Sequence, residues 1–166
     1  MISRYFYKFI YVLLFLLTCF SKAYSEGFKF NITEIEILNN GNLFKGIKRG
    51  TIEADNGIII IADKFIYNKL SNIVEAEGKV KIEDSINNNF IFSDKATYKR
   101  NDEIIFTEGN AKVVDNENRE ITANKLTYKK IPNIIEAEGK VKIEDSINNN
   151  FIFVIISALT IKVNKN

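Results

Sequence analysis

The sequence contains no histidine, and it has only one cysteine and one proline in 166 residues. Histidine is the commonest general base and the commonest side-chain ligand of transition metals, so its absence argues against an enzyme or a metal site. The single cysteine, Cys19, leaves no pair for a disulfide within the chain. We therefore predict a protein without catalytic function, metal or cofactor.

A dominant charge of one sign is also missing. The chain has 23 basic and 21 acidic residues, for a formal net charge of +2. Removal of residues 1–25, considered below, would take away Arg4, Lys8 and Lys22 and leave a net charge of about −1. A nearly neutral surface of mixed sign offers no electrostatic basis for binding nucleic acid, so we predict no nucleic-acid partner.

The N-terminal apolar run, residues 9–20, is short. Its length of about twelve residues falls below the ~20 that a membrane-spanning helix needs. Arg4 and Lys8 precede it, and an Ala-x-Ser site ending at Ser25 follows it, which is the pattern of a secretory signal peptide. We predict a signal peptide over residues 1–25, with an uncleaved N-terminal anchor as the alternative. Thr18, directly before Cys19, argues against lipidation of that cysteine.

What the chain does have is internal repetition. Residues 75–92 (EAEGKVKIEDSINNNFIF) recur letter for letter as residues 136–153. A shorter period lies beneath this duplication, because three tyrosines about thirty residues apart are each followed by a glycine in the same relative position. The three pairs are Tyr67 and Gly78, Tyr98 and Gly109, and Tyr128 and Gly139. The repeating unit is therefore about thirty residues long.

Within each unit, apolar and charged residues alternate strictly, as in the VKIE segments at residues 80–83 and 141–144. A period of two indicates β-strands with one apolar face. Turn-forming residues separate the strands, for example at residues 70–72, 85–89 and 131–133. We predict an all-β fold of short antiparallel strands, each about five to six residues long.

Superposition of the units predicts which side chains share the inner, apolar face. Equivalent positions form four rows, one of which (Ala76, Thr107 and Ala137) carries small side chains that leave room a packed core would have to fill. The alternative is that this face is simply a filled core. The predicted lipid-contacting residues are Val74, Ala76, Val80, Ile82, Ile105, Thr107, Ala111, Val113, Ile135, Ala137, Val141 and Ile143.

The repeated motifs resemble a known family. The run A-D-K-x-x-Y over residues 62–67, followed by A-E-G-K-V at residues 76–80, is similar to the OstA-like, or LptA-type, β-jellyroll, which includes LptA, LptC and the N-terminal domain of LptD. The motif recurs with variation at residues 93–113 and 123–141. The resemblance implies an open, V-shaped antiparallel β-jellyroll with about thirty residues per repeat.

The resemblance also implies a function. Members of this family form a periplasmic bridge that shields the acyl chains of lipopolysaccharide during export to the outer membrane. The expected partners are the lipid A acyl chains of lipopolysaccharide and other Lpt-type jellyroll domains, which would pair through edge strands. The expected location is the periplasm, with outer-membrane association in an LptD-like assembly or inner-membrane anchoring if the signal is uncleaved. The alternative is a structural β-solenoid or adhesin-like interaction module without lipid cargo.

The repeat pattern breaks near the C-terminus. A further S-D-K-x-x-Y unit after Phe153 would place a tyrosine at position 159, where the sequence has leucine. We interpret residues 26–153 as the jellyroll domain and residues 154–166 as a divergent tail. An LptD-like protein would continue into an outer-membrane domain, so a truncated LptD-like product and a short LptA-like protein are the two interpretations.

Overall fold

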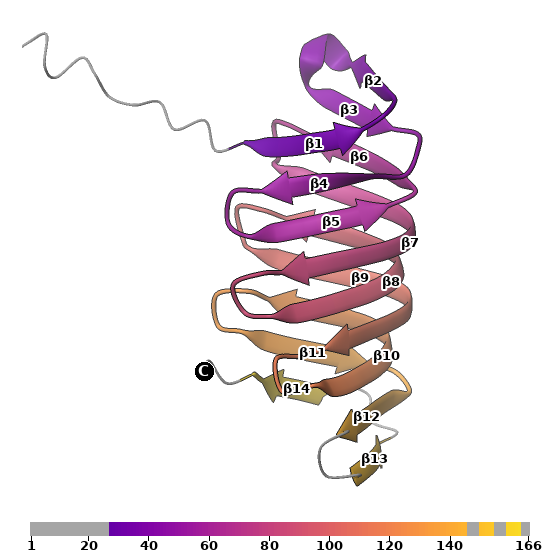
Figure 1. Cartoon of the computed structure of the whole chain (residues 1–166), viewed down its shortest axis with the longest axis vertical. Coiled ribbons are helices and arrows are strands. Elements are labelled where there is room, and N and C mark those ends of the chain that lie inside the picture. Colours follow the sequence, from indigo (N-terminus) through magenta and orange to yellow (C-terminus); the bar gives the residue numbers. More distant parts are fainter. Residues whose placement is uncertain (1–26, 146–149, 155–158, 164–166) are drawn as a thin grey trace, which may run out of the picture.

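Figure 1 shows an antiparallel sheet that coils from one end of the molecule to the other. The computed structural model describes residues 27–145, 150–154 and 159–163. Within these residues the sheet has 14 strands, and one short 3-10 helix, η1 (Asn39–Gly41), lies between β2 and β3. The strands are β1 (Phe28–Ile32), β2 (Ile35–Leu38), β3 (Leu43–Gly46), β4 (Gly50–Ala54), β5 (Ile58–Ala62), β6 (Lys64–Asn68), β7 (Ile73–Asp84), β8 (Asn89–Lys99), β9 (Ile104–Val114), β10 (Arg119–Lys129), β11 (Ile134–Glu138), β12 (Val141–Asp145), β13 (Asn150–Val154) and β14 (Leu159–Lys162).

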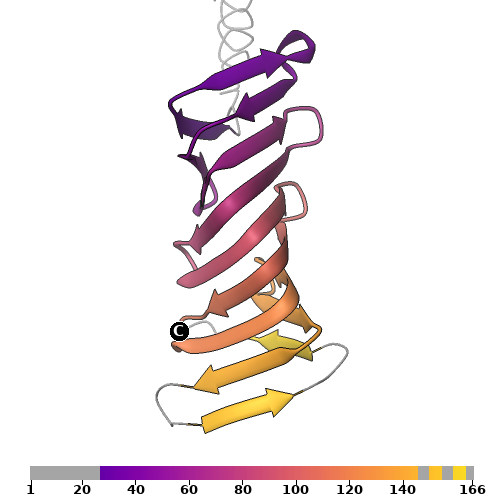
Figure 2. The same cartoon turned by 90° about the vertical axis from the view of Figure 1, so that its right-hand side faces the viewer.

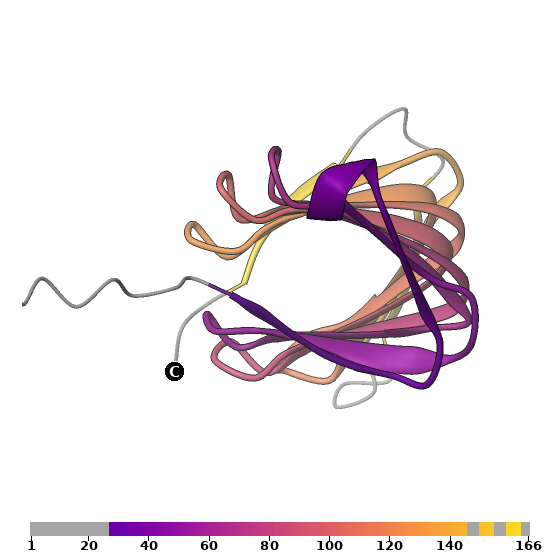
Figure 3. The ribbon, with the colours of Figure 1, turned by 90° about the horizontal axis from the view of Figure 1, so that it is seen from above.

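The sheet is folded over on itself into two facing walls. The first wall contains β1, β4, β5, β12 and β13, and the second contains β2, β3, β6, β11 and β14. The four long strands β7 to β10 belong to both walls, because each bends near its middle; β5 and β6, for example, pair with opposite halves of β7. Seen from above, the sheet is a U whose bends form one side and whose turns form the two free lips (Figure 3).

A β-bulge near the middle of β7 and another near the middle of β9 make the bend, and β8 and β10 bend opposite them. In β7 two residues, Gly78 and Lys79, lie opposite one residue of β8, and both have positive φ (83° and 45°). Glycine is the residue best suited to the first of these conformations. The same pair of conformations recurs at Gly109 and at Gly139 with the residue that follows each. The bends stack along the molecule, and Figure 2 shows the long strands crossing them obliquely, one beneath another.

The bend explains the repeated A-D-K and E-G-K motifs. The backbone N–H of Asp63 donates a hydrogen bond to the carbonyl of Gly78 at 3.0 Å, and the Asp63 side chain lies where a Cβ on that glycine would be. On the outer surface, Glu77 faces Lys64 on one neighbouring strand and Lys95 on the other. The two motifs are therefore the two halves of one corner, with alternating charges across its strands.

The core lies between the walls. Along most strands, buried and more exposed residues alternate, and the buried ones form one continuous cluster from Ile52 in β4 to Val163 beyond β14. This confirms the predicted all-β, antiparallel jellyroll with one apolar face. Strand length differs from the prediction of five to six residues, because β7 to β10 are 11 or 12 residues long. A bulge bends a strand without ending it, so Gly78 lies inside β7 and Gly109 inside β9, whereas Gly139 lies between β11 and β12.

The C-terminal strand replaces the missing tyrosine in an unexpected way. In β14, Leu159 pairs with Ala137 and Ile161 pairs with Ile135, the same row that holds Tyr98 and Tyr128 on other strands. Ile161, and not Leu159, thus occupies the register of the tyrosine. The predicted signal peptide over residues 1–25 lies outside the described residues, as do parts of the predicted tail. Among the residues described, we find no helix long and apolar enough to cross a membrane.

Candidate functional site

The residues predicted to form the apolar face do share the inner side of the two walls. On the second wall, one row across the strands runs Tyr67, Val74, Tyr98, Ile105, Tyr128, Ile135 and Ile161. A neighbouring row runs Gly46, Phe65, Ala76, Ala96, Thr107, Leu126, Ala137 and Leu159. Six of the predicted contact residues lie in these two rows.

The first wall holds the other six predicted residues. Ile82, Val113 and Ile143 lie in a row of branched side chains that also includes Ile52, Ile60, Ile91 and Ile121. Val80, Ala111 and Val141 lie next to the bend. Sequence comparison of the units missed the isoleucines of β4, β5, β8 and β10. Alternation with polar residues would have found those of β4 and β10, whereas those of β5 and β8 have apolar neighbours in the sequence.

The two walls pack against each other over this face. Eleven of the twelve predicted residues are at most 4% exposed, and Ile143 is half-buried. The small residues do not stand alone, because Ala76 lies beside Phe65 and Ala137 beside Leu126, both large and buried. The buried hydroxyl of Thr107 is satisfied by the backbone of Leu126, to whose carbonyl it donates at 3.2 Å. In this structure the interior is filled by the protein's own side chains.

The free lips of the U are joined by polar side chains. The Tyr128 hydroxyl donates a hydrogen bond to Asp84 Oδ2 at 2.7 Å and accepts one from Asn87 Nδ2 and one from Asn89 Nδ2, each at 3.0 Å. Asn89 Nδ2 also contacts Asn133 Oδ1 at 2.9 Å, and Lys130 Nζ lies 4.0 Å from Asp84 Oδ1. These contacts join residues about forty positions apart in the sequence.

The preceding unit has a similar group of contacts. Asn56 Nδ2 donates to the Tyr98 hydroxyl at 2.7 Å and to Glu103 Oε1 at 3.0 Å, and Arg100 forms an ion pair with Asp55. We call the whole set the lip clasp. Its first-wall members are Asp55, Asn56, Asp84, Asn87 and Asn89, and its second-wall members are Tyr98, Arg100, Glu103, Tyr128, Lys130 and Asn133.

The clasp tyrosines have perturbed acidities. Burial, the largest cause, raises the pKa of Tyr98 to about 12, although the hydrogen bond from Asn56 acts in the opposite direction. Burial also raises the pKa of Tyr128 above its ordinary value, and the hydrogen bond to Asp84 and its nearby charge raise this pKa further. Both hydroxyls therefore stay protonated over the neutral pH range and can donate hydrogen bonds across the lips.

At the next unit the corresponding acidic residue is satisfied locally. Asp115 Oδ1 accepts hydrogen bonds from the backbone N–H groups of Glu117 and Arg119, both at 3.0 Å. Asp115 Oδ2 pairs with the guanidinium of Arg119 at 2.7 Å. Ile161 and Val163 stand in the register of Tyr128 and Lys130 there, so the opposite lip offers apolar side chains. The lip clasp therefore covers two units and is replaced by a local ion pair at the third.

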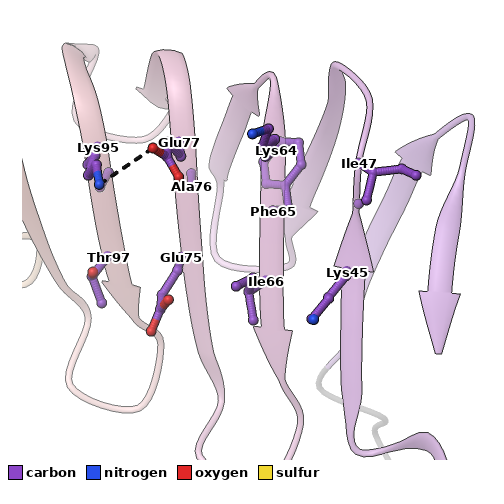
Figure 4. Close-up of a pocket in the computed structure, with 12 residues that line it drawn as sticks. Lys45, Ile47, Lys64, Phe65, Ile66, Glu75, Ala76, Glu77, Lys95 and Thr97 are labelled. Carbon is purple, nitrogen blue, oxygen red and sulfur yellow. Dashed lines mark ion pairs between the residues drawn. The ribbon is translucent and has the colours of Figure 1, made fainter. Parts of the chain in front are cut away.

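A hollow of about 300 Å³ lies on the outer face, over β3, β6, β7 and β8 (Figure 4). Side chains from two outward-facing rows surround it, including Lys45, Glu75, Glu77 and Lys95. Glu77 and Lys95 form an ion pair at 3.5 Å, and both are well exposed. The hollow is thus lined by charges of both signs, together with Gly46, Phe65, Ala76 and Ala96 of the inner row.

The arrangement of repeated corners and facing apolar walls matches a known family. The family model for OstA-like proteins matches residues 29–149, which is most of the chain. The chain belongs to the OstA-like protein family. The match covers all three repeats of the corner motif, and this confirms the resemblance inferred from the sequence.

A solved structure supports the fold of this OstA-like chain. It is LptH from Pseudomonas aeruginosa, described as the LptA-homologous periplasmic component of the conserved lipopolysaccharide transport device. The two structures agree with a TM-score of 0.62 at 11% sequence identity, over 79% of this chain and 96% of LptH. At that identity the likeness establishes the fold alone. A comparison with curated protein sequences gives no match.

Proposed function

We propose that this OstA-like chain is a periplasmic lipopolysaccharide-binding domain that shields acyl chains between its two walls during export to the outer membrane. The observation that carries the proposal is the continuous apolar inner surface, which runs through every unit from β4 to β14. The family match and the printed description of LptH support the same function. Shielding needs no catalytic group, metal or cofactor, in keeping with the sequence.

Binding in this mode requires the walls to separate, because the inner face is buried in the structure. An acyl chain between the walls would cover each wall again, so the inner surface of the protein loses little burial. The lipid gains about 0.8 kcal/mol for each CH₂ group removed from water. The free energy of binding is therefore the burial of the lipid minus the cost of opening the U.

The proposed partner domains would add to the edges of the sheet. Among the residues that the structure describes, β1 pairs only with β4 and β2 only with β3 at one end, and β13 pairs only with β12 and β14 only with β11 at the other. Strand β2 carries exposed apolar side chains, with Ile37 61% exposed. Exposed edge strands accept further strands through backbone hydrogen bonds. Two interpretations stay predictions: that the chain is a short LptA-like protein, and that it is a truncated LptD-like product.

A structural module without lipid cargo is the second candidate. The filled interior favours it, because large residues such as Phe65 and Leu126 already occupy the space beside the small ones. The two candidates differ in whether lipid ever reaches the inner face. They make opposite predictions for a crosslinking experiment.

The experiment places a small diazirine amino acid at Val80 or at Lys81 in cells that make lipopolysaccharide. Val80 is 2% exposed and faces inward, and the neighbouring Lys81 has a side chain 38% exposed on the outer face. Ultraviolet light should yield lipopolysaccharide adducts at Val80 and none at Lys81. Protease resistance of both variants, compared with the unsubstituted chain, serves as the control for folding. Absence of adducts at Val80 in a folded protein would favour the structural module.

A further inference from the structure

We infer that the lip clasp is the gate of this domain, through which an acyl chain passes sideways into the space between the walls. This inference rests on the proposed function. The inner face is buried, so the walls must separate before lipid can enter, and the polar side chains of the clasp would control that separation. Three features of the U support the gate: the way its two sides are connected, the composition of the clasp and the incomplete hydrogen bonding of the clasp.

The two sides of the U are connected differently. On the bent side, β7 to β10 continue from one wall to the other through covalent backbone. On the lip side, the contacts from Asn56 to Tyr98 and from Asp84 to Tyr128 join the walls through side chains. Separation of the lips breaks these side-chain contacts and leaves the strand pairing within each wall intact. The bulges with positive φ supply the natural hinge.

The composition of the clasp is unusual for the edge of a permanent core. Asp84 is fully buried; its Oδ1 accepts hydrogen bonds from the backbone N–H groups of Ile86 and Asn87, and its Oδ2 accepts hydrogen bonds from the Asn87 amide and, across the lips, from the Tyr128 hydroxyl. A buried polar network stabilises a structure only while its members remain satisfied, and apolar packing at the same place would be more robust. Because the clasp side chains are polar, water can form hydrogen bonds with them in place of the clasp contacts when the walls separate.

Two buried atoms in the clasp lack a partner within the described residues. They are Asn56 Oδ1 and Asn89 Oδ1, each on a side chain whose amide nitrogen forms clasp hydrogen bonds. An unsatisfied buried acceptor costs free energy that hydration would return. Opening the lips exposes both oxygens to water, which offsets part of the loss of the clasp hydrogen bonds. The closed state is thereby held, but not strongly.

A disulfide across the lips tests the gate directly. Asn89→Cys and Asn133→Cys, in a full chain that also carries Cys19→Ser, place two thiols where the amide contact of 2.9 Å now joins the walls. The control pair is Glu77→Cys with Lys95→Cys, on adjacent strands of one wall. The probe is purified lipopolysaccharide with a fluorophore on its sugar, and uptake is measured before and after reduction.

Oxidation of the lip pair should lower the uptake rate at least about tenfold, and reduction should restore it, whereas the control pair should show no change. Equal uptake by the oxidised and reduced lip pair would overturn the gate while leaving lipid binding intact. If neither the parent chain nor the reduced variants take up lipopolysaccharide, the proposed function fails, and the gate fails with it.

A second variant does not depend on disulfide formation. Tyr128→Phe removes the hydroxyl that contacts Asp84, Asn87 and Asn89 across the lips. Lys112→Met is its control, because the Lys112 side chain lies on the outer face and donates a hydrogen bond of 3.2 Å to Glu120 on the neighbouring strand of the same wall. Uptake should be about tenfold faster for Tyr128→Phe and unchanged for Lys112→Met. Unchanged or slower uptake in Tyr128→Phe, with the protein folded, would refute the gate.

Discussion

Replacement of Gly109 by alanine tests whether the glycine of each corner motif is needed for the bend. Gly109 has φ of +75°, and a Cβ there would lie 2.5 Å from Asp94 Oδ2 and 3.0 Å from Asp94 Cβ. Asp94 cannot move without cost, because its Oδ2 accepts a hydrogen bond of 2.9 Å from Asn110 Nδ2. The substitution therefore combines backbone strain with the displacement of a neighbouring side chain.

The magnitude follows from these two contributions. A residue with a Cβ in the left-handed region costs about 1–2 kcal/mol, and loss of one hydrogen bond costs about 1 kcal/mol. Gly109→Ala should lower the free energy of unfolding by about 2–3 kcal/mol. Gly41→Ala isolates the first contribution, because Gly41 has φ of +86° and nothing within 4 Å of its would-be Cβ. Any change that alanine makes to the unfolded chain is similar in both variants.

The assay is urea denaturation followed by circular dichroism. With a slope of about 2 kcal/mol per molar urea, Gly109→Ala should lower the midpoint by about 1–1.5 M and Gly41→Ala by about 0.5–1 M. In a chain that already carries Asp94→Ala, Gly109→Ala should cost only about as much as Gly41→Ala, since the closest atom and its hydrogen bond are absent before the glycine is replaced. Equal losses for Gly109→Ala and Gly41→Ala would show that packing of Asp94 against the glycine contributes nothing to the bend.

Two further predictions concern the ionisable groups of the lips. Because the pKa of Tyr98 is about 12 in the folded chain and about 10 when unfolded, stability should fall as pH rises from 10 to 12; Tyr98→Phe should show a shallower fall in alkaline urea titrations. Asp115→Ala removes the buried acceptor of the backbone N–H groups of Glu117 and Arg119 and one of the two carboxylate partners of the Arg119 guanidinium, and should cost about 2–4 kcal/mol by urea denaturation. Lys29→Ala, which removes an exposed ion pair, should cost less than about 1 kcal/mol; comparable losses would contradict the burial argument.

Most of the inner face could be predicted from alternation and the repeat. Period two assigns Val80 and Ile82 to one side of a strand whatever its partners are, and the structure places both inside. Which large residues lie beside the small ones was harder to predict from the sequence. The register of β6 against β7 decides, for example, that Phe65 lies beside Ala76. Without that register the small residues suggested empty space, whereas the neighbouring large residues fill it.

The lip clasp could not be predicted from the units alone. Asp84 and Tyr128 belong to different repeats and different walls, and they meet only because the bends fold the sheet over on itself. The length of the long strands was missed for a related reason. Gly78 and Gly109 bend β7 and β9 without ending them, so segments predicted as separate short strands are halves of one long strand. The position of Ile161 in the tyrosine row could not be predicted either, because it depends on the pairing of β14 with β11.

The corner also makes the molecule extensible. Each unit of about thirty residues contributes two long strands that cross both walls, and strands lie about 4.8 Å apart, so one unit lengthens the U by about 10 Å. Residues 75–92 recur as residues 136–153, at an offset of 61 residues, which is the length of two such units. An in-frame duplication of that size preserves the inward and outward alternation and adds about 19 Å of apolar interior. The length of the domain can therefore change by whole units while the alternation of inward and outward residues in each strand stays the same.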